Sequence, residues 1–157
     1  MSVAQFIGCG HLLRLSVARE LAGYTESPGA YGGDEKDFCL RAIDAGYEII
    51  ELAGVHVWHD KTPLARDLPE QHRSGVCNDL TLVLRRVPAV LVVPTVVVKF
   101  AKHLLFSIKH GLFRAGLLGM RDFLSAAPEI WRARLPVRAA SLAQFYSLSR
   151  APRKAAG

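Results

Sequence analysis

The predicted fold depends on residues 32–46, which read GGDEKDFCLRAIDAG. The side chain of Asp34 can accept a hydrogen bond from the backbone N–H of Asp37, and the acids that follow fill the first turn, where they suit the helix dipole. Gly46 suits the left-handed position that commonly follows a helix. The stretch therefore predicts a helix that begins at Asp34 and ends just before Gly46.

Two β-rich runs after this helix predict strands. Residues 47–52 read YEIIEL, and residues 55–59 read VHVWH. Alternate side chains of a strand point to opposite faces, so His59 and His56 should point in opposite directions. Shorter elements are expected earlier in the chain, namely strand pieces at 6–7 and 12–13 and a helix over 16–21.

The bulk composition is that of one globular domain. Of the 157 residues, 50% are hydrophobic, which is enough for a core. The three cysteines are an odd number without paired spacing, so they predict neither a zinc site nor a disulfide framework, and a reducing cytoplasm is the natural compartment. The N-terminus lacks the basic region and the long apolar core of a signal peptide.

Charge divides the chain into an acidic and a basic half. Residues 1–80 contain 7 Lys/Arg and 12 Asp/Glu, a net charge of −5, whereas residues 81–157 contain 13 Lys/Arg and 2 Asp/Glu, a net charge of +11. A basic region of this kind predicts nucleic acid or an anionic membrane as its partner. Few aromatic residues and long aliphatic runs in this region argue against nucleic acid.

From Asn78 onward the sequence predicts basic helices that prolines 88, 94, 128 and 136 punctuate. The longest apolar run, 87–98, is shorter than the about 20 residues that a membrane-spanning helix needs. We therefore expect these helices to bind the inner face of the cell membrane peripherally, or else to pack on the domain with their lysines in water. The amphipathic pattern rests on an apolar stripe among basic residues: Phe100, Leu104, Leu105, Ile108 and Leu112 beside Lys99, Lys102, Lys109 and Arg114.

The order of these motifs resembles the acceptor-side half of family 2 glycosyltransferases. The resemblance implies an α/β fold, namely part of the sheet-and-helix layer of a nucleotide-diphospho-sugar transferase (glycosyltransferase A-type) with C-terminal helices appended. It divides the chain into an acceptor and catalytic half at 1–80, a basic helical region at 81–150 and a flexible tail at 151–157. The matching pieces are Phe6-x-Gly8, Arg14, Ala22-Gly23-Tyr24-x-Glu26, the acidic helix start, Leu40-Arg41, Gly46-Tyr47, Val57-x-His59 and Asn78-Asp79-Leu80.

The same resemblance implies that an acid at the start of the helix acts as a catalytic base. Glu35, or its neighbour Asp34, would deprotonate the acceptor hydroxyl, which then attacks a nucleotide-sugar with inversion. Asp37 and Arg41 would shape the acceptor site and brace the acids. Each acid also has a plainer interpretation, as a helix cap or as a solvated residue of the first turn.

A metal and an aromatic platform complete the implied site. His59 would ligate a Mn²⁺ or Mg²⁺ ion that neutralises the leaving diphosphate, or it would be a hydrogen-bonded core histidine. Trp58 would stack on an acceptor sugar or pack in the core.

The implied partners are a nucleotide-sugar donor, a glycan or lipid-linked acceptor, and the membrane surface. The chain contains no Asp-x-Asp motif, which the donor-binding half of such enzymes carries before this region. A partner chain or a preceding segment would have to supply that half. The alternative is a non-catalytic relative that binds a membrane surface or a partner protein.

Overall fold

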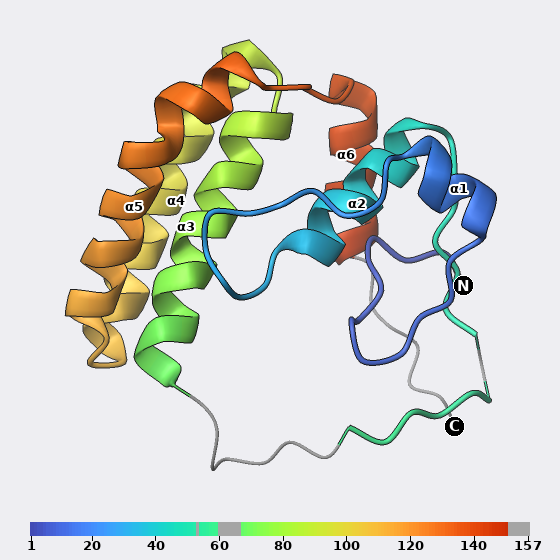
Figure 1. Ribbon diagram of the computed structural model, residues 1–157, viewed down its shortest axis with the longest axis horizontal. Helices are drawn as coiled ribbons and strands as arrows, with labels where there is room; N and C mark the ends of the chain where they lie inside the picture. Colours follow the sequence, from blue (N-terminus) through green and yellow to red (C-terminus); the bar gives the residue numbers. More distant parts are fainter. Residues whose placement is uncertain (53, 60–66, 151–157) are drawn as a thin grey trace. The chain divides into compact units, whose positions relative to one another are not determined.

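The computed structural model describes residues 1–52, 54–59 and 67–150, and the regular structure there is helical (Figure 1). The chain forms two compact units, one with α1, α2 and α6 and the other with α3, α4 and α5. The tail predicted at 151–157 lies outside the described residues. In chain order the helices are α1 (Leu15–Glu20), α2 (Asp34–Asp44), α3 (Leu68–Arg86), α4 (Ala89–Lys109), α5 (Phe113–Arg132) and α6 (Ala139–Arg150).

The expectation of an α/β fold is wrong, because the described part of the chain is helical and contains no strand. In the stretch predicted as the strand 47–52, Ile50 forms an isolated antiparallel bridge with Ser2, and residues 55–59 are exposed. A strand needs neighbours across a sheet and a buried face, and β propensity alone supplies neither. The strand pieces predicted at 6–7 and 12–13 are also not strands.

In the first unit, α2 forms where the sequence predicts it. The helix begins at Asp34 and is followed by Gly46, whose φ of 88° is in the left-handed region. The N–H of Tyr47 donates to the carbonyl of Ala42 at 2.9 Å, and the N–H of Gly46 donates to the carbonyl of Ile43 at 3.1 Å. These two bonds make a Schellman motif. Both predicted ends of this helix are therefore confirmed.

Helix α6 packs against α2 in the same unit. Oδ1 of Asp44, at the end of α2, accepts hydrogen bonds from the backbone N–H of Arg138 at 2.9 Å and from its Nε at 3.1 Å. Burial acts to raise the pKa of Asp44, but hydrogen bonds from Ser141 and Arg138 outweigh it, and the pKa is lowered. The carboxylate of Asp44 therefore joins the end of α2 to the start of α6.

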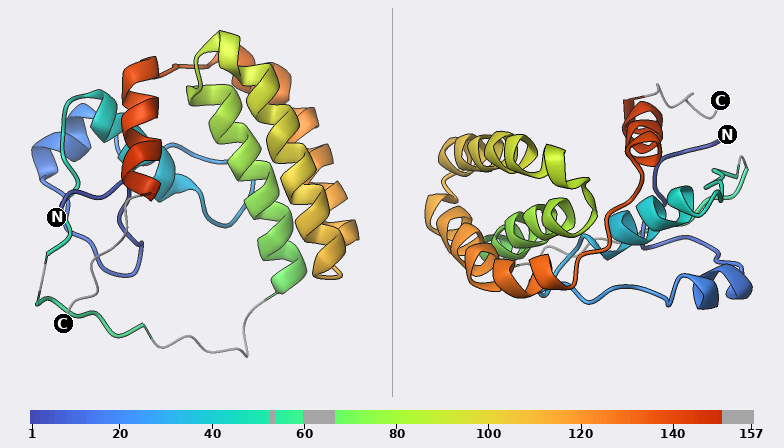
Figure 2. Two further views of the ribbon diagram at one scale, coloured as in Figure 1. Left: turned by 180° about the vertical axis from the view of Figure 1, so that it is seen from behind. Right: turned by 90° about the horizontal axis from the view of Figure 1, so that it is seen from above.

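The second unit consists of α3, α4 and α5, which lie side by side in alternating directions (Figure 1 and Figure 2). The contact between α3 and α5 is the most extensive, and α4 packs against both. A turn at Gly111, with a φ of 68°, joins α4 to α5. The core between α3 and α5 contains the buried side chains of Val76, Leu80, Val83, Met120, Phe123 and Ile130.

Side chains cap both ends of α3. Oδ1 of Asp67 accepts from the N–H of Glu70 at 3.0 Å at the start of the helix. At the other end, Arg134 donates from Nε to the carbonyl of Leu84 at 3.2 Å and from Nη2 to the carbonyl of Val87. A guanidinium at this end satisfies carbonyls that have no partner within the helix, and it suits the helix dipole.

The helix boundaries in this unit differ from the prediction in two ways. The sequence predicts helices from Asn78 onward, but α3 already begins at Leu68. Prolines were expected to separate helices, but Pro94 and Pro128 lie inside α4 and α5. Proline disfavours a helix interior only by a few kcal/mol, and tertiary packing overrides that preference here.

Candidate functional site

The two acids proposed as a base lie in the first turn of α2 and are half-buried. A Cβ atom at Gly8 would lie 2.3 Å from Oε1 of Glu35, so the glycine leaves the room that this carboxylate occupies. Burial, and after it the charge of Glu35, raises the pKa of the Tyr24 hydroxyl, and Asp34 contributes in the same direction. The structure therefore places Glu35 close to Gly8 and Tyr24.

Sequence reasoning misses an aromatic cluster that includes Tyr24. Its hydroxyl lies 2.8 Å from Nε2 of His11 in a hydrogen bond. The His11 ring stacks on Phe6 with 4.2 Å between centroids, and the Tyr24 ring packs 5.3 Å from that of Phe38. These residues come from separate segments of the first unit, so no spacing in the sequence signals the cluster.

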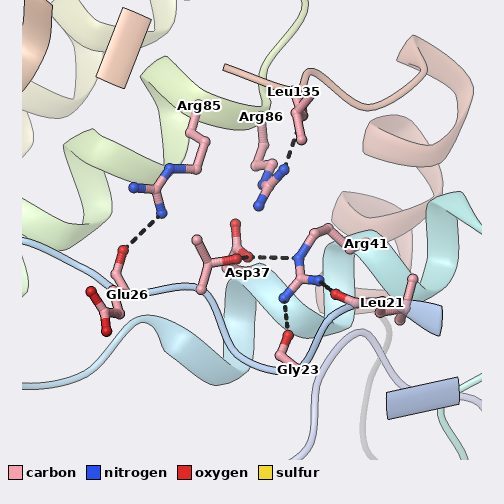
Figure 3. Close-up of polar contacts among 9 residues, drawn as sticks. Leu21, Gly23, Glu26, Asp37, Arg41, Arg85, Arg86 and Leu135 are labelled. Carbon is pink, nitrogen blue, oxygen red and sulfur yellow. Dashed lines mark hydrogen bonds and ion pairs between the residues drawn. The ribbon is translucent and has the colours of Figure 1, made fainter. Parts of the chain in front are cut away.

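Asp37 and Arg41 form an ion pair that holds the chain after α1 (Figure 3). Nε of Arg41 donates to Oδ2 of Asp37 at 2.8 Å, and the hydroxyl of Thr25 donates to the same oxygen at 2.9 Å. The other guanidinium nitrogens donate to the carbonyls of Leu21 and of Gly23, the latter at 2.6 Å. Asp37 is only 4% exposed, so this pair orders the local backbone. Binding of an acceptor by Asp37 and Arg41 stays a prediction.

Trp58 and His59 lie on an exposed segment of the first unit. The Trp58 residue is 96% exposed, which excludes packing in the core. Among the residues that the structure describes, no three His, Cys, Asp or Glu side chains come together as a metal site requires. Metal binding by His59 stays a prediction.

The cysteines differ in their expected reactivity. Burial raises the pKa of Cys39 to about 12, although a hydrogen bond to the backbone of Phe6 opposes the shift. Cys77 is also buried, and burial raises its pKa, whereas Cys9 is exposed. Because the thiolate is the reactive form, we expect an aromatic disulfide reagent at pH 8 to label only Cys9 rapidly in the native protein.

The number of thiols that react is measured by absorbance, with a Cys9→Ser variant as the control. That variant should lose the rapid phase, and all three thiols of the unmodified protein should react in guanidinium chloride. Rapid labelling of two thiols in the native protein would contradict the burial of Cys39 or Cys77.

In the second unit, Asn78 of α3 holds the loop at residues 26–33. Its Oδ1 accepts from the N–H of Gly29 at 2.8 Å. Its Nδ2 donates to the carbonyls of Gly29 at 3.0 Å, Tyr31 at 3.1 Å and Gly32 at 2.6 Å. Arg85 fixes the start of the loop by donating to the carbonyl of residue 26 at 3.0 Å (Figure 3). Asn78, which the sequence shows only as part of a motif, therefore has a structural role here.

A row of exposed apolar side chains on α4 is a second candidate site. These residues follow each other at helical spacing, and they include Val97, which is 62% exposed, and Leu105, which is 67% exposed. The row consists of Val90, Val93, Val97, Leu104, Leu105 and Ile108, and it is called the apolar row below.

Three polar residues of α4, namely Lys99, His103 and Ser107, contact α3. Nζ of Lys99 and Nε2 of His103 both contact Oδ2 of Asp79, the latter at 3.0 Å. The hydroxyl of Ser107, which is buried, lies 2.7 Å from Nε2 of His72. Lys99, which one interpretation of the sequence places in water, is therefore paired between helices. Helix α4 therefore exposes a row of apolar side chains on a face where an ordinary surface helix exposes polar ones.

No family model, curated protein or solved structure matches this chain. The helical fold of the described residues does not contain the sheet on which family 2 glycosyltransferases are built. The resemblance drawn from the motif order is therefore wrong. The motifs at 34–46 and at Asn78 instead have local roles, as helix ends and as an anchor for a loop.

Proposed function

We propose that this chain binds the surface of an anionic membrane through the apolar row of α4. The observation that supports the proposal is the arrangement of side chains on this helix, which exposes the apolar row and pairs Lys99, His103 and Ser107 with α3. In water the reverse orientation is favoured, because exposed apolar area costs about 25 cal/mol per Å². An apolar contact outside the chain removes this cost.

The positive charge of this region favours an anionic membrane as the partner that covers the apolar row. Helix α4 contains no Asp or Glu, and residues 81–157 have a net charge of +11. Lys102 and Lys109 of α4 and Arg114 of α5 are exposed. Basic side chains near a bilayer surface contribute about 1 kcal/mol each when the lipid is anionic. The inner face of the cell membrane is the surface that meets this requirement.

The packing of the second unit favours a helix that lies on the membrane. By length and composition, α4 with its 21 residues could cross a bilayer. A crossing α4 would place α3 and α5 on opposite sides, because each directly adjoins one end of it. These two helices instead pack against each other, with Arg73 of α3 bonded to Asp122 of α5. Arg134, which follows α5, also bonds to the carbonyl of Leu84 near the end of α3. Interfacial binding leaves these contacts intact.

The test compares sedimentation with vesicles of phosphatidylcholine and with vesicles that also contain phosphatidylglycerol. The full chain should bind the anionic vesicles more tightly, and added salt should weaken binding. The double substitution Val97→Asp with Leu105→Asp should reduce binding at least about tenfold, because both side chains would have to leave the interface. Both positions are exposed, so the fold should be kept, as circular dichroism would show.

Leu12→Asp is the matched control, because Leu12 is 91% exposed but lies in the first unit. This variant should bind vesicles like the unmodified chain. Undiminished binding by the α4 double variant would overturn the assignment to α4. Equal binding to both kinds of vesicle would overturn the role of charge, and binding to duplex DNA in place of vesicles would overturn the choice of partner.

The sugar transfer expected from Glu35 stays a prediction, as do its nucleotide-sugar donor and its acceptor. Membrane binding does not depend on that reaction. A chain held at the membrane would be close to lipid-linked molecules, whether or not the acids of α2 act on them.

A further inference from the structure

The contact between α3 and α4 contains three imidazole groups. The ring of His72, on α3, stacks on Phe106 of α4 with 5.4 Å between centroids. Phe106 in turn packs 4.1 Å from the ring of His110. The third imidazole, His103, is the one that contacts Asp79. A change in the charge of His72 therefore acts directly at the contact between α3 and α4.

The hydrogen bonds assign the proton on neutral His72. The hydroxyl of Ser107 donates to the carbonyl of His103 at 2.6 Å, so its oxygen accepts from Nε2–H of His72 at 2.7 Å. A second proton on His72 would go to Nδ1. Protonation thus creates a cation between the helices without breaking the bond to Ser107.

The surroundings of His72 oppose that cation. From α4 it faces His103 and His110, and from α5 it meets the backbone at Gly116, where a Cβ atom would lie 3.5 Å from Nε2. Burial, followed by the charges of His103 and His110, lowers the pKa of His72.

Two carboxylates in the contacts of this unit are already paired with cations. Asp79 of α3 is held by Lys99 and His103 of α4. Asp122 of α5 is paired with Arg73, the neighbour of His72 on its own helix, at 2.5 Å. Neither carboxylate is therefore left over to balance a charge on His72.

The sign of the pH dependence follows from the lowered pKa. Docked α4 holds His72 below its ordinary pKa of 6.5, so the docked state binds fewer protons than the undocked state. The contribution of neutral His72 to docking is fully present above pH 6.5, and it is lost as the pH falls through the lowered pKa of the docked state.

We propose that mild acidification releases α4 from α3 and thereby strengthens the binding of α4 to an anionic membrane. This inference rests on the proposed membrane binding. Undocking frees the polar side of α4, so that the helix can adjust its depth in the interface, and the added positive charge attracts anionic lipid. His72 is the group that couples pH to this change.

The experiment measures binding of the full chain to phosphatidylglycerol-containing vesicles at pH 7.5 and pH 5.5. Binding should increase about fivefold at the lower pH. The His72→Gln variant keeps a side-chain N–H for Ser107 but cannot be protonated, so its binding should match that of the unmodified chain at pH 7.5 and should not increase. His59→Gln, at an exposed histidine of the first unit, should keep the full increase.

Amide hydrogen exchange without vesicles gives a second readout that needs no variant. After correction for the intrinsic effect of pH, α4 should lose protection at pH 5.5, while the contact of α3 with α5 keeps it. Binding that does not change with pH, an increase that persists in His72→Gln, or unchanged protection of α4 would each overturn the inference. Absence of binding at both pH values would instead overturn the proposed function.

Discussion

Replacing Gly119 by alanine is expected to lower the free energy of unfolding by about 3 kcal/mol. Gly119 lies in α5 where this helix crosses α3, and it is buried. A Cβ atom there would lie 2.4 Å from the carbonyl oxygen of Arg73 and 2.9 Å from Cβ of Val76. The first of these is a backbone atom of α3, so a rotamer change cannot relieve the overlap, and the two helices would have to separate.

Gly75→Ala is the matched control for this prediction. Gly75 also lies inside a helix, α3, but a Cβ atom at this position meets nothing within 4 Å. Alanine should therefore raise the stability by up to about 1 kcal/mol through helix propensity. Urea unfolding followed by circular dichroism measures both changes. Equal effects of the two substitutions would show that α3 and α5 do not approach as closely as the structure indicates.

Replacing Asn78 by alanine is expected to cost about 2 kcal/mol and to release the loop at residues 26–33. The amide of Asn78 is buried, and it bonds to one N–H and three carbonyls of that loop. Its removal leaves these backbone groups without their partner, and the loop would have to move to reach water. Chymotrypsin should then cut after Tyr31 faster than in the unmodified chain.

The substitution Asn78→Asp distinguishes the contribution of the hydrogen bonds that Asn78 donates from that of the bond it accepts. The carboxylate can still accept from the N–H of Gly29, but it loses the Nδ2 donor and faces the carbonyls of Gly29, Tyr31 and Gly32. We expect this variant to be less stable than Asn78→Ala above pH 6, because a buried carboxylate would then be charged. If Asp and Ala have the same effect, the donated hydrogen bonds contribute little.

The local parts of this fold are readable from the sequence because they depend on neighbouring residues. The acids after Asp34 and the glycine at 46 mark both ends of α2, and the structure has the helix between them. The helical pattern predicted after residue 78 is also present in α4 and α5. Each of these features is decided within one or two turns of chain.

The predicted sheet failed because strand pairing is not a local property. The residues at 47–52 and 55–59 have a high propensity for β-strands. Within the part of the chain that the structure describes, however, the bridge between Ser2 and Ile50 is the only strand-like pairing that they make. Because the order of the motifs resembled a family with an α/β fold, these segments were predicted to be strands of a sheet. The motif at residues 34–46 therefore predicted a helix correctly, whereas the resemblance of the whole series of motifs predicted a sheet that the described residues do not form.

The sequence by itself determined the ends of α2, the helical character of the basic half and the uneven distribution of charge. Only the tertiary structure decided which side of α4 is buried, because that choice depends on Asp79 and His72 of another helix. Likewise, the role of Asn78 depends on Gly29, far earlier in the chain. Caps and periodicity act over a few residues, whereas these contacts exist only after α3, α4 and the loop have packed together.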